Sequence, residues 1–428
     1  ADYMNFYERA LYNHILASQD RSNGMMCYFV PLRMGTKKGF SSELHDFTCC
    51  VGTGIENHVK YGESIYYKGK AGNLYVNLFI PSVLTWKEKN LKVTLNANIP
   101  VDPTVTLTVD PGKKSQTLPI HIRKPYWVHG AVNVTVNGKP ISGDVNSEGY
   151  IVVNKKWSAG DVIRLELPST LHKMAMPDNA SRQAFFYGPV LLAGNLGKTE
   201  PDPMNGTPVI VTASDDLTHW IKQDATDPLT FKTEKVGEPA DITLQPFYGM
   251  DDEYYTVYFD VFTPDKWKEQ QKVYAEQKKA AYELEQSTVD ILRVGEMQPE
   301  RDHNLSGENT EAGEDHTRKF RTAHRGGSFT FTMKVIPGFS YILVNTYWGM
   351  DNRGRVFDIL VDDEVIATED INKYKDSKFY DIQYRIPSKL TNGKNSITIT
   401  FRAKKNNEAG PIYGVRLVKE SIVTPADK

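Results

Sequence analysis

Short segments in which apolar and polar residues alternate recur along most of this chain of 428 residues. A period of two predicts strands that have one buried face and one solvated face. Asn137-Gly138, inside residues 131–141, is also a strong signal for a two-residue hairpin. Many short strands at this spacing favour antiparallel sandwiches. In the first half of the chain the alternating segments are residues 74–80, 91–97, 104–110, 118–123, 131–141 and 162–168.

Two further stretches extend the β-rich pattern. Residues 182–194 are nearly all apolar and predict a buried pair of strands, whereas residues 198–245 are polar and predict loops with short strands. Residues 252–262 return to strand character. From about residue 295 to 420 we expect a second all-β unit, for which a jelly-roll sandwich of the carbohydrate-module type fits best. Its strands are expected within residues 327–336, 340–349, 355–367, 378–387, 395–403 and 412–420.

Helical periodicity is confined to a few places. In residues 1–20, Met4, Tyr7, Leu11 and Ile15 recur on one face, which predicts an amphipathic helix that starts at the first residue and must bury its stripe. This helix is either a small helix packed on its own domain or a helix cut from a larger helical domain. Residues 24–47 read as a long loop with one short strand, CYFVPL (27–32).

A long charged helix is expected over residues 266–284. Its helix formers and its thin stripe of Trp267, Val273, Tyr274 and Ala281 suit a connection between two domains better than a helix on a membrane surface.

Composition excludes several classes of function. The formal net charge is −2, with 51 basic and 53 acidic residues and no Lys/Arg run, which argues against a nucleic-acid partner. No apolar run approaches the roughly 18 residues that span a membrane. The N-terminus lacks the basic start and apolar stretch of a secretory signal. Three cysteines are too few for a disulfide framework, so they do not reveal the compartment.

Chemical specificity is concentrated in FTCCVGTGIENH (47–58), where Cys49 and Cys50 precede glycines suited to an entry turn and a helix with Ile55 and Val59 on one face. A thiolate at a helix N-terminus is stabilised by the exposed N–H groups and the dipole. Two adjacent thiolates repel each other unless a cation neutralises them, and Zn²⁺ is the usual cation. By spacing alone, a pair of ordinary small core cysteines is the favoured interpretation, because the usual CxxC form is absent.

Residues 47–67 (FTCCVGTGIENHVKYGESIYY) resemble the signature of glycoside hydrolase families 127 and 146, the bacterial β-L-arabinofuranosidases. YERALYNHILASQ (7–19) and CYFVPL resemble the run that leads into it. GEMQPERDHNLSGE, TYWGMDNRGR and AGPIYGVRLV resemble the C-terminal module of the family 146 branch. The resemblance covers nearly the whole chain.

It implies a mostly β fold with an α-helical N-terminal remnant, the last helices of an (α/α)6 barrel followed by jelly-roll-like β-sandwich domains. The expected divisions are 1–66 (barrel remnant), 67–195 (sandwich), 196–263 (small β-rich extension), 264–294 (linking helix) and 295–428 (C-terminal sandwich).

The resemblance also implies a mechanism. Cys49 would be the nucleophile of a retaining reaction and a zinc ligand, and Cys50 would be a ligand only. The family's other two ligands, a glutamate and a cysteine, and its acid/base glutamate precede the pair by on the order of 80 residues, whereas 48 residues precede Cys49 here. Because two ligands cannot fill a tetrahedral site, we expect weak zinc binding, an inactive truncated chain, and a barrel remnant that could self-associate. Cys27 does not match the missing ligand.

The implied substrate is an arabinose-containing plant oligosaccharide or polysaccharide. By analogy, relatives are exported to the periplasm or cell surface of gut bacteria. Two other functions stay open: a non-catalytic carbohydrate-binding chain built of β-sandwich modules, and a structural or interaction protein.

Other candidate residues have both a binding and a structural interpretation. Tyr28 aligns with a tyrosine that touches the sugar in relatives. His45, with Asp46 beside it, could contact substrate or lie in a solvated loop. Glu56 and His58 could support the site or stabilise their own helix.

The C-terminal block adds two more candidate clusters. Trp348 and its neighbours Tyr347, Asp351 and Arg353 could stack on and bind a sugar, or they could belong to the core and a turn. His303, in a polar cluster with Glu300, Arg301 and Asp302, is equally open, and both Trp348 and His303 are taken as candidate substrate-binding residues.

Overall fold

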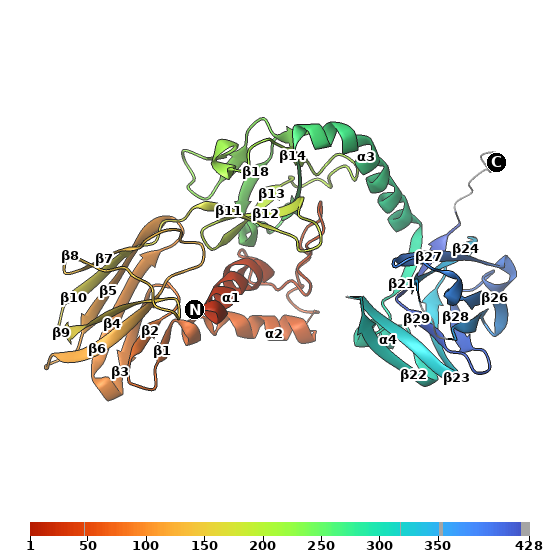
Figure 1. The fold of residues 1–428 in the computed structure, drawn as a ribbon, viewed down its shortest axis with the longest axis horizontal. Coiled ribbons are helices and arrows are strands. Elements are labelled where there is room, and N and C mark those ends of the chain that lie inside the picture. Colours follow the sequence, from red (N-terminus) through yellow and green to blue (C-terminus); the bar gives the residue numbers. More distant parts are fainter. Residues whose placement is uncertain (47, 317, 351–353, 421–428) are drawn as a thin grey trace. The chain divides into compact units, whose positions relative to one another are not determined.

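The computed structural model describes residues 1–46, 48–316, 318–350 and 354–420. The chain forms two compact units, residues 1–274 and residues 275–428. Strands dominate both units, and the N-terminal segment is helical (Figure 1). The expected fold class, mostly β with an α-helical N-terminal part, is therefore confirmed.

The N-terminal segment is one continuous helical rod followed by a loop and a second helix. Helix α1 (Asp2–Ala10) continues as a π-helical turn (Leu11–Ile15) and a 3₁₀ turn (Leu16–Ser18). Met4 and Leu11 are buried with Ile65 and Leu78, so the predicted apolar stripe does face a core. Helix α2 (Cys49–His58) follows after the loop.

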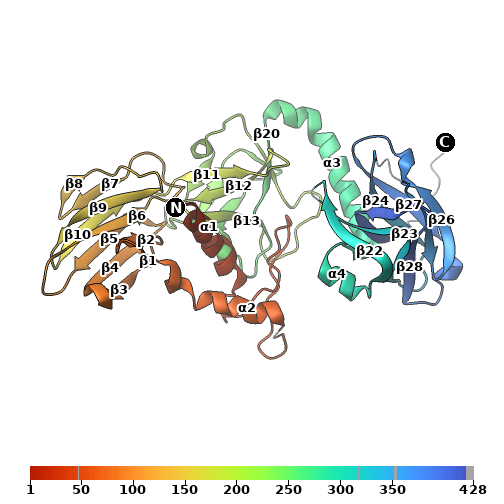
Figure 2. The same cartoon turned by 60° about the horizontal axis from the view of Figure 1, so that its bottom comes forward.

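The first sandwich consists of a four-stranded and a six-stranded sheet (Figure 2). The predicted hairpin is present: Asn137 (φ 49°) and Gly138 (φ 76°) have the positive φ values that a type I′ turn needs at both positions. Alternate residues of each strand enter one shared core, including the fully buried Trp127 and Trp157. The first sheet has the order β1 (Tyr66–Lys68), β2 (Leu74–Val76), β6 (Gln116–Arg123), β9 (Tyr150–Trp157); the second has the order β3 (Ser82–Trp86), β4 (Leu91–Asn98), β5 (Asp102–Asp110), β10 (Asp161–Glu166), β7 (Asn133–Val136), β8 (Lys139–Ile141).

A second sheet system completes the first unit. The apolar stretch 182–194 forms the expected buried antiparallel pair, β12 and β13. The polar stretch after it holds only short strands, as expected. The strands are β11 (Leu171–Ala175), β12 (Arg182–Tyr187), β13 (Val190–Asn195), β14 (Val209–Val211), β15 (Ile221–Gln223), β16 (Phe231–Thr233), β17 (Gly237–Glu238), β18 (Thr243–Pro246), β19 (Tyr255–Thr256) and β20 (Phe259–Phe262).

Helix α3 (Pro264–Ser287) forms where the charged helical segment was expected, and none of its residues is buried. Two of the four residues of its predicted apolar stripe make packing contacts, and the other two do not. Trp267 and Tyr274 pack against Phe262, with ring centroids 5.3 and 5.7 Å from that ring. Val273 (52% exposed) and Ala281 face solvent, because so thin a stripe contacts the sheet only at the start of the helix.

The second unit is a sandwich of two antiparallel sheets around one apolar core. The six predicted strand segments all form strands there. One sheet has the order β21 (Thr288–Leu292), β30 (Gly414–Lys419), β24 (Tyr341–Trp348), β27 (Phe379–Ile386); the other contains β22 (Ser306–Asp315), β23 (Arg318–Lys334), β28 (Ser396–Ala403), β25 (Val356–Val361) and β26 (Glu364–Asp370), with β29 (Ala409–Ile412) paired to β23. Helix α4 (Met297–Asp302) precedes β22. The remaining single-turn 3₁₀ helices of the chain are Tyr61–Ser64, Lys87–Lys89, Leu217–His219, Phe247–Gly249, Ile371–Lys373 and Ser388–Leu390.

Two local predictions are wrong. CYFVPL is not a strand: Cys27 forms only an isolated bridge with Phe40, and the chain bends at the next residues, because no neighbouring strand continues the ladder. The glycines after the cysteine pair do not form an entry turn, since α2 already begins at Cys49. The expected apolar face of this helix is also exposed, Ile55 by 43% and Val59 by 79%. Among the described residues, no helix is both long and apolar enough to cross a membrane.

Candidate active site

The cysteine pair occupies the first turn of α2. Thr48 is the N-cap, with an extended backbone, and its carbonyl accepts the N–H groups of Val51 (3.0 Å) and Gly52 (3.2 Å). Cys49 and Cys50 are both exposed and both free. The interpretation of the pair as core cysteines therefore does not describe this structure. Their sulfurs stand where the unpaired N–H groups of a helix stabilise negative charge.

Three side chains meet at this turn. The Cys49 and Cys50 Sγ atoms are 3.7 Å apart, and the Tyr28 hydroxyl lies 3.4 Å from the Cys49 Sγ. The hydrogen bond from Tyr28, followed by that from Cys50, lowers the pKa of the Cys49 thiol. The same contact raises the pKa of Tyr28, so the phenol keeps its proton and donates it to the sulfur. The arrangement favours a thiolate at Cys49.

The spacing of the sulfurs can be compared with the geometry that zinc requires. Two Zn–S bonds of about 2.3 Å at a tetrahedral angle place the sulfurs about 3.8 Å apart. The observed 3.7 Å fits a pair of thiolates on one zinc ion. Within residues 1–46, 48–316, 318–350 and 354–420, however, no group of three His, Cys, Asp or Glu side chains could hold a metal. The residues present therefore fit two of the four ligand positions of a tetrahedral zinc site.

The loop that carries Tyr28 is held by contacts on both sides. The buried Cys27 thiol donates to the Phe29 carbonyl (3.0 Å), so this third cysteine is engaged away from the pair. A Cβ on Gly54 would lie 2.9 Å from the terminal carbon of Met26, which shows how closely α2 approaches the loop. Farther along the loop, Lys38 is buried against the extension and donates to the Phe247 carbonyl (3.2 Å).

The helix before the loop is anchored by a buried polar network that sequence reasoning missed. Glu8 (2% exposed) accepts from Arg123 (2.5 Å) and from the Trp127 indole (2.9 Å), and Arg123 also donates to Asn5 (2.6 Å) and the Asn77 carbonyl (2.6 Å). Glu8 looks from sequence like an ordinary surface position of an amphipathic helix. Only its place one turn after Met4, on the buried stripe, could have signalled the contact.

The remaining candidates near the pair have structural surroundings. His45 and Asp46 are exposed in a turn, where Asp46 accepts from the Ser42 N–H (2.7 Å) and His45 N–H donates to the Ser42 hydroxyl (3.3 Å). Glu56 is exposed on α2. His58 hydrogen-bonds the Tyr61 hydroxyl, and burial lowers its pKa.

In the C-terminal unit the two candidate clusters separate. Tyr347 lies in the core and shares a hydrogen bond with Tyr384 (3.0 Å), whereas Trp348 faces outward and stacks on His316, with ring centroids 3.8 Å apart. His303 is fixed between Asp290 (3.1 Å) and the Pro299 carbonyl (2.7 Å). Asp351 and Arg353 lie outside the described residues.

The polar cluster beside His303 is also tied into the fold. Glu300 accepts hydrogen bonds from Nε (2.7 Å) and Nη2 (2.5 Å) of Arg321, and from the Gly295 N–H. Arg301 and Asp302 are on the exposed side of α4, in which Gln298 donates to Asp302 (2.7 Å). These contacts fix α4 against β23.

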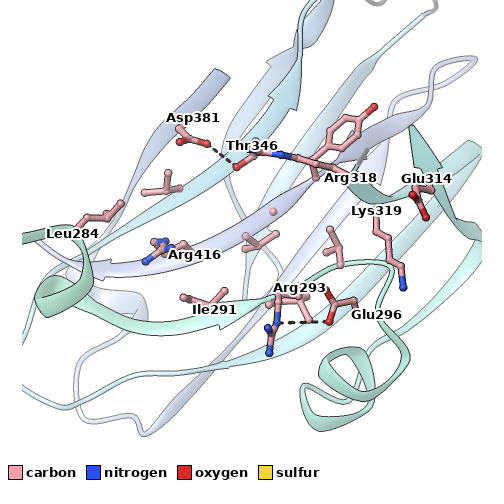
Figure 3. Close-up of a pocket in the computed structure, with 16 residues that line it drawn as sticks. Leu284, Ile291, Arg293, Glu296, Glu314, Arg318, Lys319, Thr346, Asp381 and Arg416 are labelled. Atoms are coloured by element: carbon pink, nitrogen blue, oxygen red, sulfur yellow. Dashed lines mark hydrogen bonds and ion pairs between the residues drawn. The ribbon is translucent and has the colours of Figure 1, made fainter. Parts of the chain in front are cut away.

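The same unit has a charged hollow of about 580 Å³ over strands β21, β30 and β24 (Figure 3). Arg293 pairs with Glu296 (3.7 Å), and the Thr346 hydroxyl donates to Asp381 (2.6 Å), so opposite charges and polar groups alternate along it. Leu284 and Ile291, both more than two-fifths exposed, complete one end. The hollow combines apolar surface with four basic side chains (Arg293, Arg318, Lys319 and Arg416) and three acidic ones (Glu296, Glu314 and Asp381).

Four protein-family models match successive parts of the chain. Residues 1–63 match the catalytic domain of the GH127 β-L-arabinofuranosidases, and residues 73–169 match the GH127 middle domain. Residues 194–261 match a domain of unknown function, DUF4986, and residues 283–418 match a family of unknown function, DUF6805. Both GH127 matches fall in the first unit, and the first of them contains the cysteine pair and Tyr28.

Several solved structures are similar to the chain. A GH127 β-L-arabinofuranosidase from Geobacillus stearothermophilus T6 is 19% identical with a TM-score of 0.49, over 61% of this chain and 46% of that one. A second structure, titled as a glycoside hydrolase, is 20% identical with a TM-score of 0.48, over 61% and 48%. A GH127 β-arabinofuranosidase is 18% identical with a TM-score of 0.46, over 61% and 47%. The chain thus spans less than half the length of these proteins. No curated protein matches the sequence.

Proposed function

Residues 1–63 and 73–169 belong to glycoside hydrolase family 127, and from that premise we propose that the chain carries the thiolate part of a retaining β-L-arabinofuranosidase site. The observation that carries the proposal is the sulfur pair, 3.7 Å apart on the first turn of α2, with the Tyr28 hydroxyl on Cys49. The family match supports a carbohydrate substrate of this class, and this geometry supports Cys49 as the reactive residue.

Cys49 is the proposed nucleophile. Its Sγ attacks the anomeric carbon of a β-L-arabinofuranoside as the bond to the leaving oxygen breaks, and that oxygen takes a proton from a general acid. Water then displaces the sulfur, so that the configuration is retained over two inversions. The hydrogen bond from Tyr28 and the helix N-terminus hold negative charge on the sulfur before attack and on its departure.

Cys49 and Cys50 are the two residues of this chain that would hold zinc. When bound, the metal lowers the pKa of its thiol ligands and fixes their positions. Two further ligands and the general acid would have to come from outside the described residues. We therefore propose that these 428 residues bind zinc weakly and do not turn over substrate alone.

Exposed apolar side chains in the GH127 catalytic segment support the idea of missing partner surface. Tyr3 (93%), Phe6 (67%), Phe29 (80%), Leu44 (77%) and Val59 (79%) all face solvent within residues 1–63. Large side chains exposed together in one segment are typical of a surface that is covered in the functional protein. Uncovered, this surface would promote self-association. Action on arabinose-containing plant glycans outside the cytoplasm is part of the same proposal.

Zinc titration of the reduced chain tests the proposal. We expect one weak site per chain, read as Co²⁺–thiolate charge-transfer absorption when Co²⁺ replaces Zn²⁺, and its loss in both Cys49→Ser and Cys50→Ser. Cys27→Ser is the matched control and should keep the absorption. Equal absorption in all four proteins, or none in any, would remove the metal from the proposal.

A further inference from the structure

The C-terminal unit contains a polar cavity of about 400 Å³ that is separate from the cysteine pair. Strands β22, β23 and β24 and the chain around β29 contribute its walls. Six of the side chains that line it form its two main walls: Glu311, His316, His324, Trp348, Arg355 and Glu408. The volume is within the usual range of small-molecule sites, roughly 300–1,000 Å³.

One wall of the cavity is a network of charged side chains. The Arg355 side chain is 5% exposed, forms an ion pair with Glu408 and donates to the Thr322 hydroxyl (3.2 Å). His324 lies between Glu311 (3.1 Å) and Glu408 (3.4 Å). Burying a guanidinium costs free energy unless it is paired, so the contacts of Arg355 hold Glu408 in place, whereas Glu311 is 64% exposed at the edge of the wall.

The other wall is aromatic. The Trp348 ring stacks on His316 at 3.8 Å with 21° between the planes, and it forms a T-shaped pair with Phe379, with 4.8 Å between the ring centroids. His316 holds a left-handed backbone (φ 50°), which is uncommon for a residue with a side chain. The indole is thereby held in a single orientation at the rim of a polar cavity.

We propose that this cavity binds one neutral sugar residue of a glycan. A sugar ring has an apolar C–H face that packs on an indole and hydroxyls that donate to fixed carboxylates. Among the residues that the structure describes, the lining contains three carboxylates, Glu311, Asp315 and Glu408, and the guanidinium of Arg355, a formal −2 before the imidazoles are counted. This balance disfavours a uronate or a phosphorylated sugar. Among the described residues no set of side chains could hold a cation to reverse it.

The site does not depend on the proposed glycosidase chemistry. Its residues lie in the segment matched by a family of unknown function, and none of them is in the GH127 segments. A neutral sugar at this position would hold a glycan on the protein whether or not the cysteine pair is competent.

The test is a binding titration of the full 428-residue chain by isothermal calorimetry and ligand-observed NMR. The probes are L-arabinose, a linear arabinotriose, and D-galacturonic acid as the anionic comparator. We expect saturable binding of a neutral probe and at least fivefold weaker binding of galacturonate, because like charges repel across a low-dielectric site. Trp348→Ala should weaken the neutral probe about tenfold, the value of one aromatic contact.

Matched variants separate a binding effect from a folding effect. Phe339→Ala removes an aromatic ring that is 45% exposed on the same unit and does not line the cavity, so it should bind like the parent. Glu311→Gln keeps the shape of the wall and should weaken binding without changing thermal stability. Cys49→Ser should also bind like the parent, which separates this proposal from the glycosidase proposal. Absence of saturable binding by both neutral probes, a preference for galacturonate, or unchanged affinity in folded Trp348→Ala would each overturn the inference.

Discussion

The Tyr28 hydroxyl lies 3.4 Å from the Cys49 sulfur, although 21 residues separate the two in the chain. This contact comes first among the causes that lower the pKa of Cys49. It joins a bend in an irregular loop to the first turn of α2. The reactivity of the thiol should therefore be set by a residue outside its own helix.

Tyr28→Phe tests this relationship. Removing the hydroxyl removes a donor to the thiolate, so the pKa of Cys49 should rise and the pH profile of its alkylation should shift to higher pH in the metal-free chain. The rate of iodoacetamide modification at Cys49, followed by peptide mass spectrometry, measures the shift. Phe29→Leu changes the exposed neighbouring ring and should leave the profile in place. Identical profiles for parent and Tyr28→Phe would show that the hydroxyl does not act on the sulfur.

The alternation of apolar and polar residues located most strands correctly because one face of each sheet is buried. Strand β22 was not recognised as a strand, since nearly all of its ten residues are exposed and no apolar period marks it. The stack of His316 on Trp348 was also out of reach, because it joins a turn to a distant strand end. The period of apolar residues indicates which face of one helix or strand is buried. It does not indicate which helices, strands or turns contact one another in the fold.

The same limit explains the errors around the cysteine pair. The sequence located the pair at a helix N-terminus but placed glycines before the helix, whereas Gly52 and Gly54 lie within it. Ile55 and Val59 follow a helical period, yet they are exposed in the part of the chain that the structure describes. A pattern can identify the face that needs a partner without supplying the partner.

Glu8→Gln should destabilise the first unit strongly. The change leaves the Arg123 guanidinium buried without a countercharge, which typically costs about 3–5 kcal/mol. The midpoint of urea unfolding, followed through the fluorescence change of the first unit, measures the loss. Glu166→Gln is the matched control, because its pair with Arg164 is about half exposed on both sides and should contribute less than about 1 kcal/mol. Similar midpoints for the two variants would contradict a structural role for the buried pair.

Gly138→Ala should destabilise the hairpin between β7 and β8 by about 1 kcal/mol, because a Cβ is strained at the positive φ of that position. A Cβ there would meet no atom within 4 Å, so the expected cost is in the backbone alone.

Gly52→Ala gives the opposite sign. It also has open space, but it lies inside α2, where alanine is favoured over glycine by about 1 kcal/mol. Hydrogen exchange of the amides that flank each position measures both effects locally. If the two substitutions changed the local stability in the same direction, the backbone conformation given to one of the two glycines would be wrong.

Lys38 should make the stability of the first unit depend on pH in the alkaline range. Burial lowers its pKa from 10.5 to about 8, so between these values the unfolded chain binds more protons than the folded chain. The free energy of unfolding should accordingly rise with pH from about 8 to about 10.5, by on the order of 3 kcal/mol for a shift of this size. Below pH 8 Lys38 is protonated in both the folded and the unfolded chain, so the free-energy cost of burying its charge is present in full.

Lys38→Met removes this titration. The difference in unfolding free energy between parent and variant, from urea titrations at pH 7, 8.5 and 10, should grow in favour of the parent as the pH rises. Lys37→Met is the neighbouring control: that side chain is 41% exposed beside Asp252, and its removal should leave the slope of the parent. A difference between parent and Lys38→Met that stays constant across the three pH values would mean that the ammonium group reaches solvent. In that case the contact with the Phe247 carbonyl would not anchor the loop that presents Tyr28.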